Sequence, residues 1–211
     1  EPATYILTAR RFGDALRAIL YSPGMSRVLP LIIDRARQGD YRALMGVAST
    51  MASSSRDSMT IGAMLTIFCS EELARIRPED VAREKQGGLL GHGLLENLEV
   101  ACEVWPKAPL PEIYRETVSS EAPTLILSGD LDPITPPRWG DATAEDLPNA
   151  LHLVAPATGH NVGPQGCAPK LIARFVDQGS FDDLDATCLE ELSRPSFFAS
   201  INGPAGGSND D

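Results

Sequence analysis

Only two stretches of this chain read as β-strands, and a single helical stretch separates them. Residues 125–127 and 151–154 are short and mostly apolar rather than alternating, which is typical of strands covered on both faces. A strand, a crossover helix and a second strand form a right-handed parallel unit. Two parallel strands flanked by about two helices leave both sheet edges unpaired and bury too little area to be stable alone. We therefore expect another polypeptide, or an upstream portion of a longer chain, to complete this sheet.

Most of the chain before residue 120 shows helical spacing instead. Helices are expected at 12–20, at 28–33, from 57 to 67 and at 94–104, with the serines at 53–55 as a turn and no periodicity between Pro78 and Gly93. Prolines 106, 109 and 111 predict an extended linker. Thr135 is the expected N-cap of the helix between the two strands, and Pro169 opens the last helix. The resulting class is α/β, with the helical region at 1–120, the strand–helix units at 121–199 and a flexible tail rich in Gly, Ser, Asn and Asp at 200–211.

The net charge limits the classes of binding partner, and the cysteine content bears on whether the protein works in an oxidising compartment. The net charge of −11 disfavours nucleic acid and anionic membrane surfaces, and no apolar stretch is long enough to span a bilayer. Four cysteines, Cys69, Cys102, Cys167 and Cys188, form no C-x-x-C pair, and no zinc site or cofactor motif is evident. They allow three disulfide pairings. In an oxidising compartment the sequential pairing is favoured because it closes the shortest loops, with buried free thiols as the alternative.

Two polar residues follow the two predicted strands, where parallel sheets carry their reactive side chains. Asp132 comes just after the first strand, and His160 comes shortly after the second. A carboxylate that holds the Nδ1–H of an imidazole leaves Nε2 free to accept the proton of a nucleophile. Each residue alone has an ordinary explanation as part of a turn, and it is their joint placement in one parallel unit that favours catalysis. His152 within the strand, His92 and Asp130 are expected to be structural.

The nucleophile of such a site is missing. No G-x-S-x-G motif occurs in the chain, and Gly206-Gly207-Ser208 follows no strand and lacks the second glycine. A serine hydrolase function therefore requires a nucleophilic serine from outside this sequence.

Residues 122–162 resemble the segment of α/β-hydrolases that contributes the acid and the histidine, in the branch of secreted tripeptidyl and prolyl aminopeptidase-like serine peptidases. Further similar pieces are 20–23, 68–72, 101–106, and 184–185 with Cys188. The resemblance implies an incomplete α/β-hydrolase, with a helical lid at 1–120 followed by the last parallel strand–helix units of the core. In this family the chain order is Ser, Asp, His, which places the serine and the oxyanion hole upstream of Glu1.

The resemblance also assigns roles to residues and a location to the protein. Asp132 matches the triad acid and His160 the triad base, and Glu71 or Glu72 is the candidate to bind the free amine of a peptide substrate. A secreted or periplasmic serine exopeptidase is implied, with the upstream half of the hydrolase as partner and with no activity of this chain alone. The number of residues released and the preferred side chain are not determined by these patterns.

Other functions remain open at this point. Asp130-x-Asp132 after a strand resembles the start of magnesium-dependent phosphatases of the haloacid dehalogenase type, but there the threonine follows two residues after the second Asp, and Thr135 follows three. A chain with acid and base but no nucleophile is also compatible with a non-catalytic binding module. An esterase portion is a third alternative, because a triad does not specify an amide substrate.

Overall fold

The computed structural model describes residues 6–58, 60–87 and 93–204. The chain divides into two compact units, Glu1–Ala18 with Tyr41–Glu116, and Ile19–Asp40 with Thr117–Asp211. One boundary lies near residue 120, where the sequence predicts the end of the helical region. Residues 19–40, however, group with the C-terminal residues. The division into 1–120, 121–199 and 200–211 stays a prediction.

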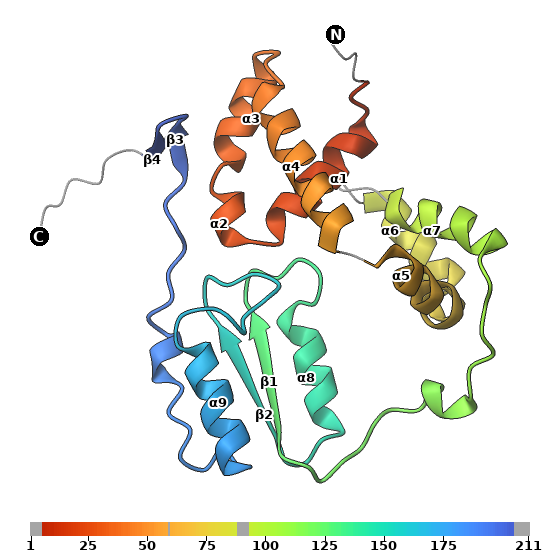
Figure 1. The fold of residues 1–211 in the computed structure, drawn as a ribbon, viewed down its shortest axis with the longest axis vertical. Coiled ribbons are helices and arrows are strands. Elements are labelled where there is room, and N and C mark those ends of the chain that lie inside the picture. The colour runs from red at the N-terminus through yellow and green to blue at the C-terminus, as the bar shows by residue number, and fades with distance from the viewer. Residues whose placement is uncertain (1–5, 59, 88–92, 205–211) are drawn as a thin grey trace, which may run out of the picture. The chain divides into compact units, whose positions relative to one another are not determined.

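The first unit is helical in the part that the structure describes (Figure 1). Its elements are α1 (Ala9–Leu20, ending in the second unit), α4 (Arg42–Ser58), α5 (Ile61–Ile67), η1 (Phe68–Glu72), η2 (Leu73–Arg75), α6 (Pro78–Gly87), α7 (Gly93–Val104) and η3 (Glu112–Arg115). The predicted helices at 12–20 and 94–104 are confirmed as α1 and α7.

Two predictions for this unit are wrong. The serines at 53–55 do not form a turn, because α4 continues through them to Ser58 and the next helix starts only at Ile61. Serine lowers helix propensity only moderately, and neither Gly nor Pro interrupts this run. The segment without periodicity contains α6, which begins with Pro78 and two acidic residues in its first turn. Those residues favour a helix N-terminus without any apolar stripe, so a search for periodicity misses it.

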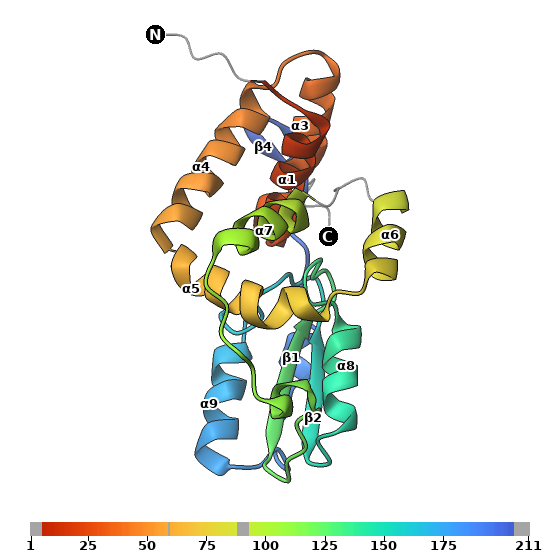
Figure 2. The same ribbon diagram turned by 90° about the vertical axis from the view of Figure 1, so that its right-hand side faces the viewer.

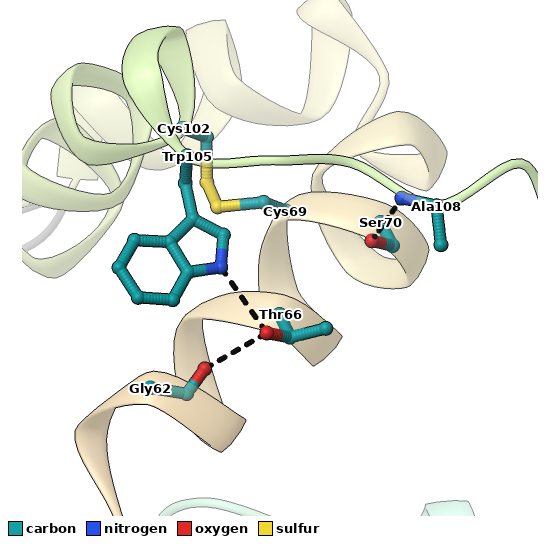
Figure 3. The surroundings of a disulfide bond; sticks show 7 residues. All are labelled: Gly62, Thr66, Cys69, Ser70, Cys102, Trp105 and Ala108. Atoms are coloured by element: carbon teal, nitrogen blue, oxygen red, sulfur yellow. Dashed lines mark hydrogen bonds between the residues drawn. A yellow bond between two sulfur atoms is a disulfide. The ribbon is translucent and has the colours of Figure 1, made fainter.

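A disulfide between Cys69 and Cys102 joins the π-helical turn η1 to α7 (Figure 3). The indole N–H of Trp105 donates to the Thr66 hydroxyl at 3.1 Å beside it, and the backbone N–H of Ala108 donates to the Ser70 hydroxyl at 3.0 Å. The covalent link and these hydrogen bonds fix η1 and the end of α5, which precedes it. They connect it to the end of α7 and to the linker that follows.

The second unit contains the predicted parallel strands. Its elements are α2 (Pro23–Ser26), α3 (Leu29–Arg37), β1 (Thr124–Gly129), α8 (Pro137–Glu145), β2 (Ala150–Ala155), α9 (Ala168–Gln178), η4 (Thr187–Leu189), β3 (Phe198–Ser200) and β4 (Gly203–Pro204). β1 and β2 pair in parallel, from Thr124 beside Ala150 to Gly129 beside Ala155, which confirms the strand–helix–strand prediction. Both views place the pair between α8 and α9 (Figure 1, Figure 2). Among the described residues no third strand joins β1 and β2.

A small apolar core lies between the sheet and α9. Its buried members are Ala155, Val162, Ala168, Leu171 and Leu189. The second disulfide, Cys167–Cys188, packs against this cluster and ties the start of α9 to η4. The sequential disulfide pairing is thus confirmed. Two disulfides suggest an oxidising, extracellular type of environment. None of the described helices is long and apolar enough to cross a bilayer.

The end of the described chain forms a short antiparallel pair, β3 with β4, and β3 lies against α3. Residues 200–204 of the predicted tail belong to this pair and its turn. The rest of that tail, 205–211, lies outside the described residues, as do His92 and the Gly206-Gly207-Ser208 sequence.

Candidate functional site

The loops that follow β1 and β2 cross in close contact. A Cβ on Gly129 would lie 2.3 Å from the carbonyl oxygens of both Thr158 and Gly159, so only glycine allows the backbones to approach this closely. The N–H of Leu131 donates to the Thr158 carbonyl at 3.0 Å. The two loops therefore hold each other, and the polar residues at their ends are brought together.

Asp132 and His160 meet at this crossing. The His160 Nδ1 lies 3.0 Å from Oδ2 and 3.1 Å from Oδ1 of Asp132. The Asp132 side chain is 3% exposed, whereas the His160 side chain is 37% exposed. A buried carboxylate therefore orients an imidazole that solutes can reach. Within the described residues Nε2 has no hydrogen-bond partner, so it is available to exchange a proton with a reacting group.

Several donors surround the Asp132 carboxylate. The backbone N–H groups of Ile134 and Thr135 donate to Oδ1 at 2.8 and 3.1 Å, and the Thr135 hydroxyl donates to Oδ2 at 2.8 Å. Burial raises the pKa of Asp132, but these hydrogen bonds, with that of His160, outweigh it and hold the pKa below its ordinary value. Asp132 is therefore ionised at neutral pH, as an acid that stabilises a charged imidazole has to be.

Thr135 has a different role from the predicted helix cap. Pro136 occupies the N-cap position of α8 and no side chain caps that helix. The Thr135 hydroxyl instead binds Asp132, and it lies 3.3 Å from the His160 Nδ1. The signal for this role is an Asp followed three residues later by Thr, a spacing at which the carboxylate accepts from the next turn of backbone. The same Asp-x-x-Thr spacing is equally compatible with Thr135 as the N-cap of the following helix.

A second hydrogen-bonded chain runs from Ser128 through His152 to Asp141. His152 Nε2 lies 2.9 Å from the Ser128 hydroxyl, and Nδ1 lies 2.8 Å from Asp141 Oδ1. Although the residue types match a catalytic triad, the geometry leaves no room for a substrate. A Cβ on Gly140 would lie 2.4 Å from His152 Nε2 and 2.9 Å from the Ser128 hydroxyl, so α8 covers the serine. The chain of contacts fastens α8 to β1 and β2, which is a structural role for His152.

Glu71 and Glu72 differ in their surroundings. Both belong to the π-helical turn η1, a kind of turn that occurs frequently at functional sites. Glu71 lines a cavity of about 170 Å³ together with Ser70, Ala74, Arg75 and Leu110. Glu72 is exposed and does not line this cavity. The carboxylate that a ligand in the cavity would meet is therefore that of Glu71.

In the part of the chain that the structure describes, no group of three or more His, Cys, Asp or Glu side chains is placed to hold a metal ion. The Asp132–His160 pair is itself equipped for proton transfer at Nε2 and for charge stabilisation by the carboxylate.

Comparison with known families agrees with the geometry. Residues 89–188 match the abhydrolase family model described as TAP-like protein, a stretch of 100 of the 211 residues that includes both Asp132 and His160. Neither curated proteins nor solved structures give a match to the chain. The mixture of helices and a parallel strand pair is compatible with part of an α/β fold. The match covers just under half of the chain; it supports an α/β-hydrolase family for residues 89–188 and suggests hydrolase activity.

Proposed function

We propose that this chain supplies the acid and the base of a secreted or periplasmic serine exopeptidase that releases residues or short peptides from free N-termini. The observation that carries the proposal is that the buried, ionised Asp132 holds Nδ1 of His160, while Nε2 has no hydrogen-bond partner among the described residues. In the mechanism, Nε2 accepts the proton of the serine nucleophile and later donates it to the leaving amine, while Asp132 stabilises the imidazolium.

The serine and the oxyanion hole come, in this proposal, from an upstream segment. The chain has no G-x-S-x-G motif, and β1 has a side with no strand partner among the described residues. The 211-residue chain alone should therefore not react with a fluorophosphonate serine probe. Stoichiometric labelling of this polypeptide would refute the division of the site.

The substrate's free amine is assigned to Glu71. A carboxylate that lines a cavity can bind an ammonium by charge-assisted hydrogen bonds, each contributing about 1.5–3 kcal/mol. We expect Glu71→Gln to lower kcat/KM for unblocked peptides by about 10- to 100-fold. Glu72→Gln is the matched comparison, since its side chain lies next in sequence outside the cavity. Equal losses in both variants would contradict the assignment.

The catalytic roles can be tested with a matched pair of variants in the protein that contains both this chain and the upstream segment. Asp132→Asn should lower turnover of an unblocked peptide p-nitroanilide by about 10⁴-fold. Asp130→Asn is the control. Its exposed carboxylate lies in the same turn. Among the described residues it accepts only the Thr158 N–H, at 3.3 Å, and an amide oxygen can replace it in that contact. Undiminished turnover in Asp132→Asn would remove this pair from the mechanism.

Two alternatives predict other outcomes of the same assay. A non-catalytic binding module predicts no hydrolysis in any variant, consistent with the missing serine motif. An esterase portion predicts that esters are cleaved, that amides are not, and that N-acetylation of the substrate has no effect.

A further inference from the structure

The backbone of His160 is held by a residue 139 positions earlier in the chain. The His160 N–H donates to the carbonyl oxygen of Tyr21 at 3.1 Å. Tyr21 lies in the turn between α1 and α2, in the same compact unit as His160. This hydrogen bond fixes the height of the His160 loop over the carboxyl end of β2.

Gly159 packs directly against the turn at Tyr21–Pro23, with no space for a side chain. A Cβ on Gly159 would lie 2.4 Å from the Tyr21 carbonyl oxygen and 2.9 Å from Pro23 Cδ. Any side chain would force the two backbones apart and break the hydrogen bond to His160. The glycine before the histidine is thus required by its close approach to Tyr21 and Pro23.

The side chains of Tyr21 and His160 also meet. Their ring centroids lie 5.3 Å apart with the planes inclined by 80°, the T-shaped geometry that aromatic pairs prefer. Asp132 contacts the imidazole only at Nδ1, so this contact alone does not prevent the ring from rotating about Nδ1. The phenol ring provides a second point of support, which limits this rotation.

The end of α2, six residues after Tyr21, is fastened to the C-terminal segment. The Arg27 guanidinium donates to the Ser196 carbonyl at 3.2 Å and lies 4.6 Å from the centre of the Phe198 ring. The Phe198 N–H donates to the Arg27 carbonyl at 2.9 Å. The helix that follows Tyr21 is therefore anchored at its far end.

We infer that Tyr21 is a positioning residue for His160, whose ring holds the imidazole plane so that Nε2 points consistently toward the reacting serine. This role rests on the proposed function of the Asp132–His160 pair. It assigns a part in catalysis to residues 19–40, at the opposite end of the sequence from the acid and the base.

The kinetic test uses the protein that contains the upstream segment. Because a misplacement of about 1 Å can cost about 10²-fold, Tyr21→Ala should lower kcat by about 10- to 100-fold. KM should stay within about twofold, since the interaction acts on the transition state. Tyr21→Phe keeps the ring pair and should restore kcat to within about twofold of the parent. Full kcat in Tyr21→Ala, or a loss in Tyr21→Phe as large as in Tyr21→Ala, would overturn the inference.

A second readout separates this inference from the proposed function. In the protein that contains the upstream segment, long-range ¹H–¹⁵N NMR reports the tautomer and mobility of the His160 ring without any turnover. Tyr21→Ala should broaden the ring signals and lower the Nδ1–H fraction, and Tyr21→Phe should not. Tyr21→Leu, which keeps bulk without an aromatic ring, replaces Tyr21→Ala if the latter does not fold. Unchanged ring signals without the aromatic ring refute the positioning role, whereas absent hydrolysis in the parent protein refutes only the proposed function.

Discussion

Thr135→Val removes one donor from the buried Asp132 carboxylate and nearly preserves the shape of the side chain. The carboxylate keeps the two backbone N–H groups of Ile134 and Thr135, but it loses the hydroxyl at 2.8 Å. A hydrogen bond to a charged group contributes about 1.5–3 kcal/mol, and water can reach the exposed Thr135 and replace part of it. We therefore expect the free energy of unfolding at neutral pH to fall by about 1–2 kcal/mol.

The pH dependence of this loss follows from the lowered pKa of Asp132 in the folded state. The stability that the ionised group contributes is fully present above the unfolded pKa of about 3.9 and disappears as the pH falls through the lower folded pKa. Thr135→Val removes part of the hydrogen bonding that lowers the pKa. The difference between parent and variant should accordingly be largest at neutral pH and shrink in acid.

Urea unfolding followed by Trp139 fluorescence measures this difference. Trp139 lies in α8, close to Thr135 in sequence, and Trp105→Phe makes it the sole tryptophan of the chain. Thr135→Ser, which keeps the hydroxyl, serves as the control and should retain most of the stability. A loss that is the same at every pH, or equal for Ser and Val, would refute this account of Asp132.

The remaining predictions concern packing and cross-links. Replacing Cys69 and Cys102 with Ser opens a loop with a sequence separation of 33 residues and should lower the free energy of unfolding by about 4 kcal/mol, measurable by urea titration. Gly140→Ala places a Cβ 2.4 Å from His152 Nε2 and should cost about 1–3 kcal/mol in thermal or urea unfolding. Gly46→Ala, with nothing within 4 Å of the added Cβ and a place inside α4, should instead stabilise by about 1 kcal/mol. A similar sign for both glycines would contradict the packing of α8 on the sheet.

Local pattern was sufficient to place Asp132 and His160. Each follows an apolar strand, and the carboxyl ends of parallel strands meet at one edge, so their proximity follows from topology alone. The disulfide pairing was also predictable from local information, because the sequential pairing closes the shortest loops. By contrast, α6 was missed because its residues carry no apolar stripe. The end of α4 was missed because the serines within it were interpreted as a turn.

The supports of the site could not be predicted from local pattern. Tyr21 contacts His160 across 139 residues of chain, and no periodicity or motif connects two such positions. Ser128 and His152 come together because they lie on the same face of the strand pair, two positions apart in register, but the closing contact depends on the tight packing of Gly140. These contacts depend on side-chain direction and backbone distance, which only the folded structure supplies.

The tautomer of His160 tests most directly whether Asp132 organises this site. Long-range ¹H–¹⁵N NMR of the protein that contains this chain and the upstream segment, at a pH where the imidazole is neutral, should show the proton on Nδ1 and an unprotonated Nε2, because the Asp132 carboxylate lies 3.0 Å from Nδ1. Asp132→Asn should reduce this preference. A dominant Nε2–H tautomer in the parent chain, or the same tautomer ratio after Asp132→Asn, would contradict the pairing of acid and base on which the proposed hydrolase function depends.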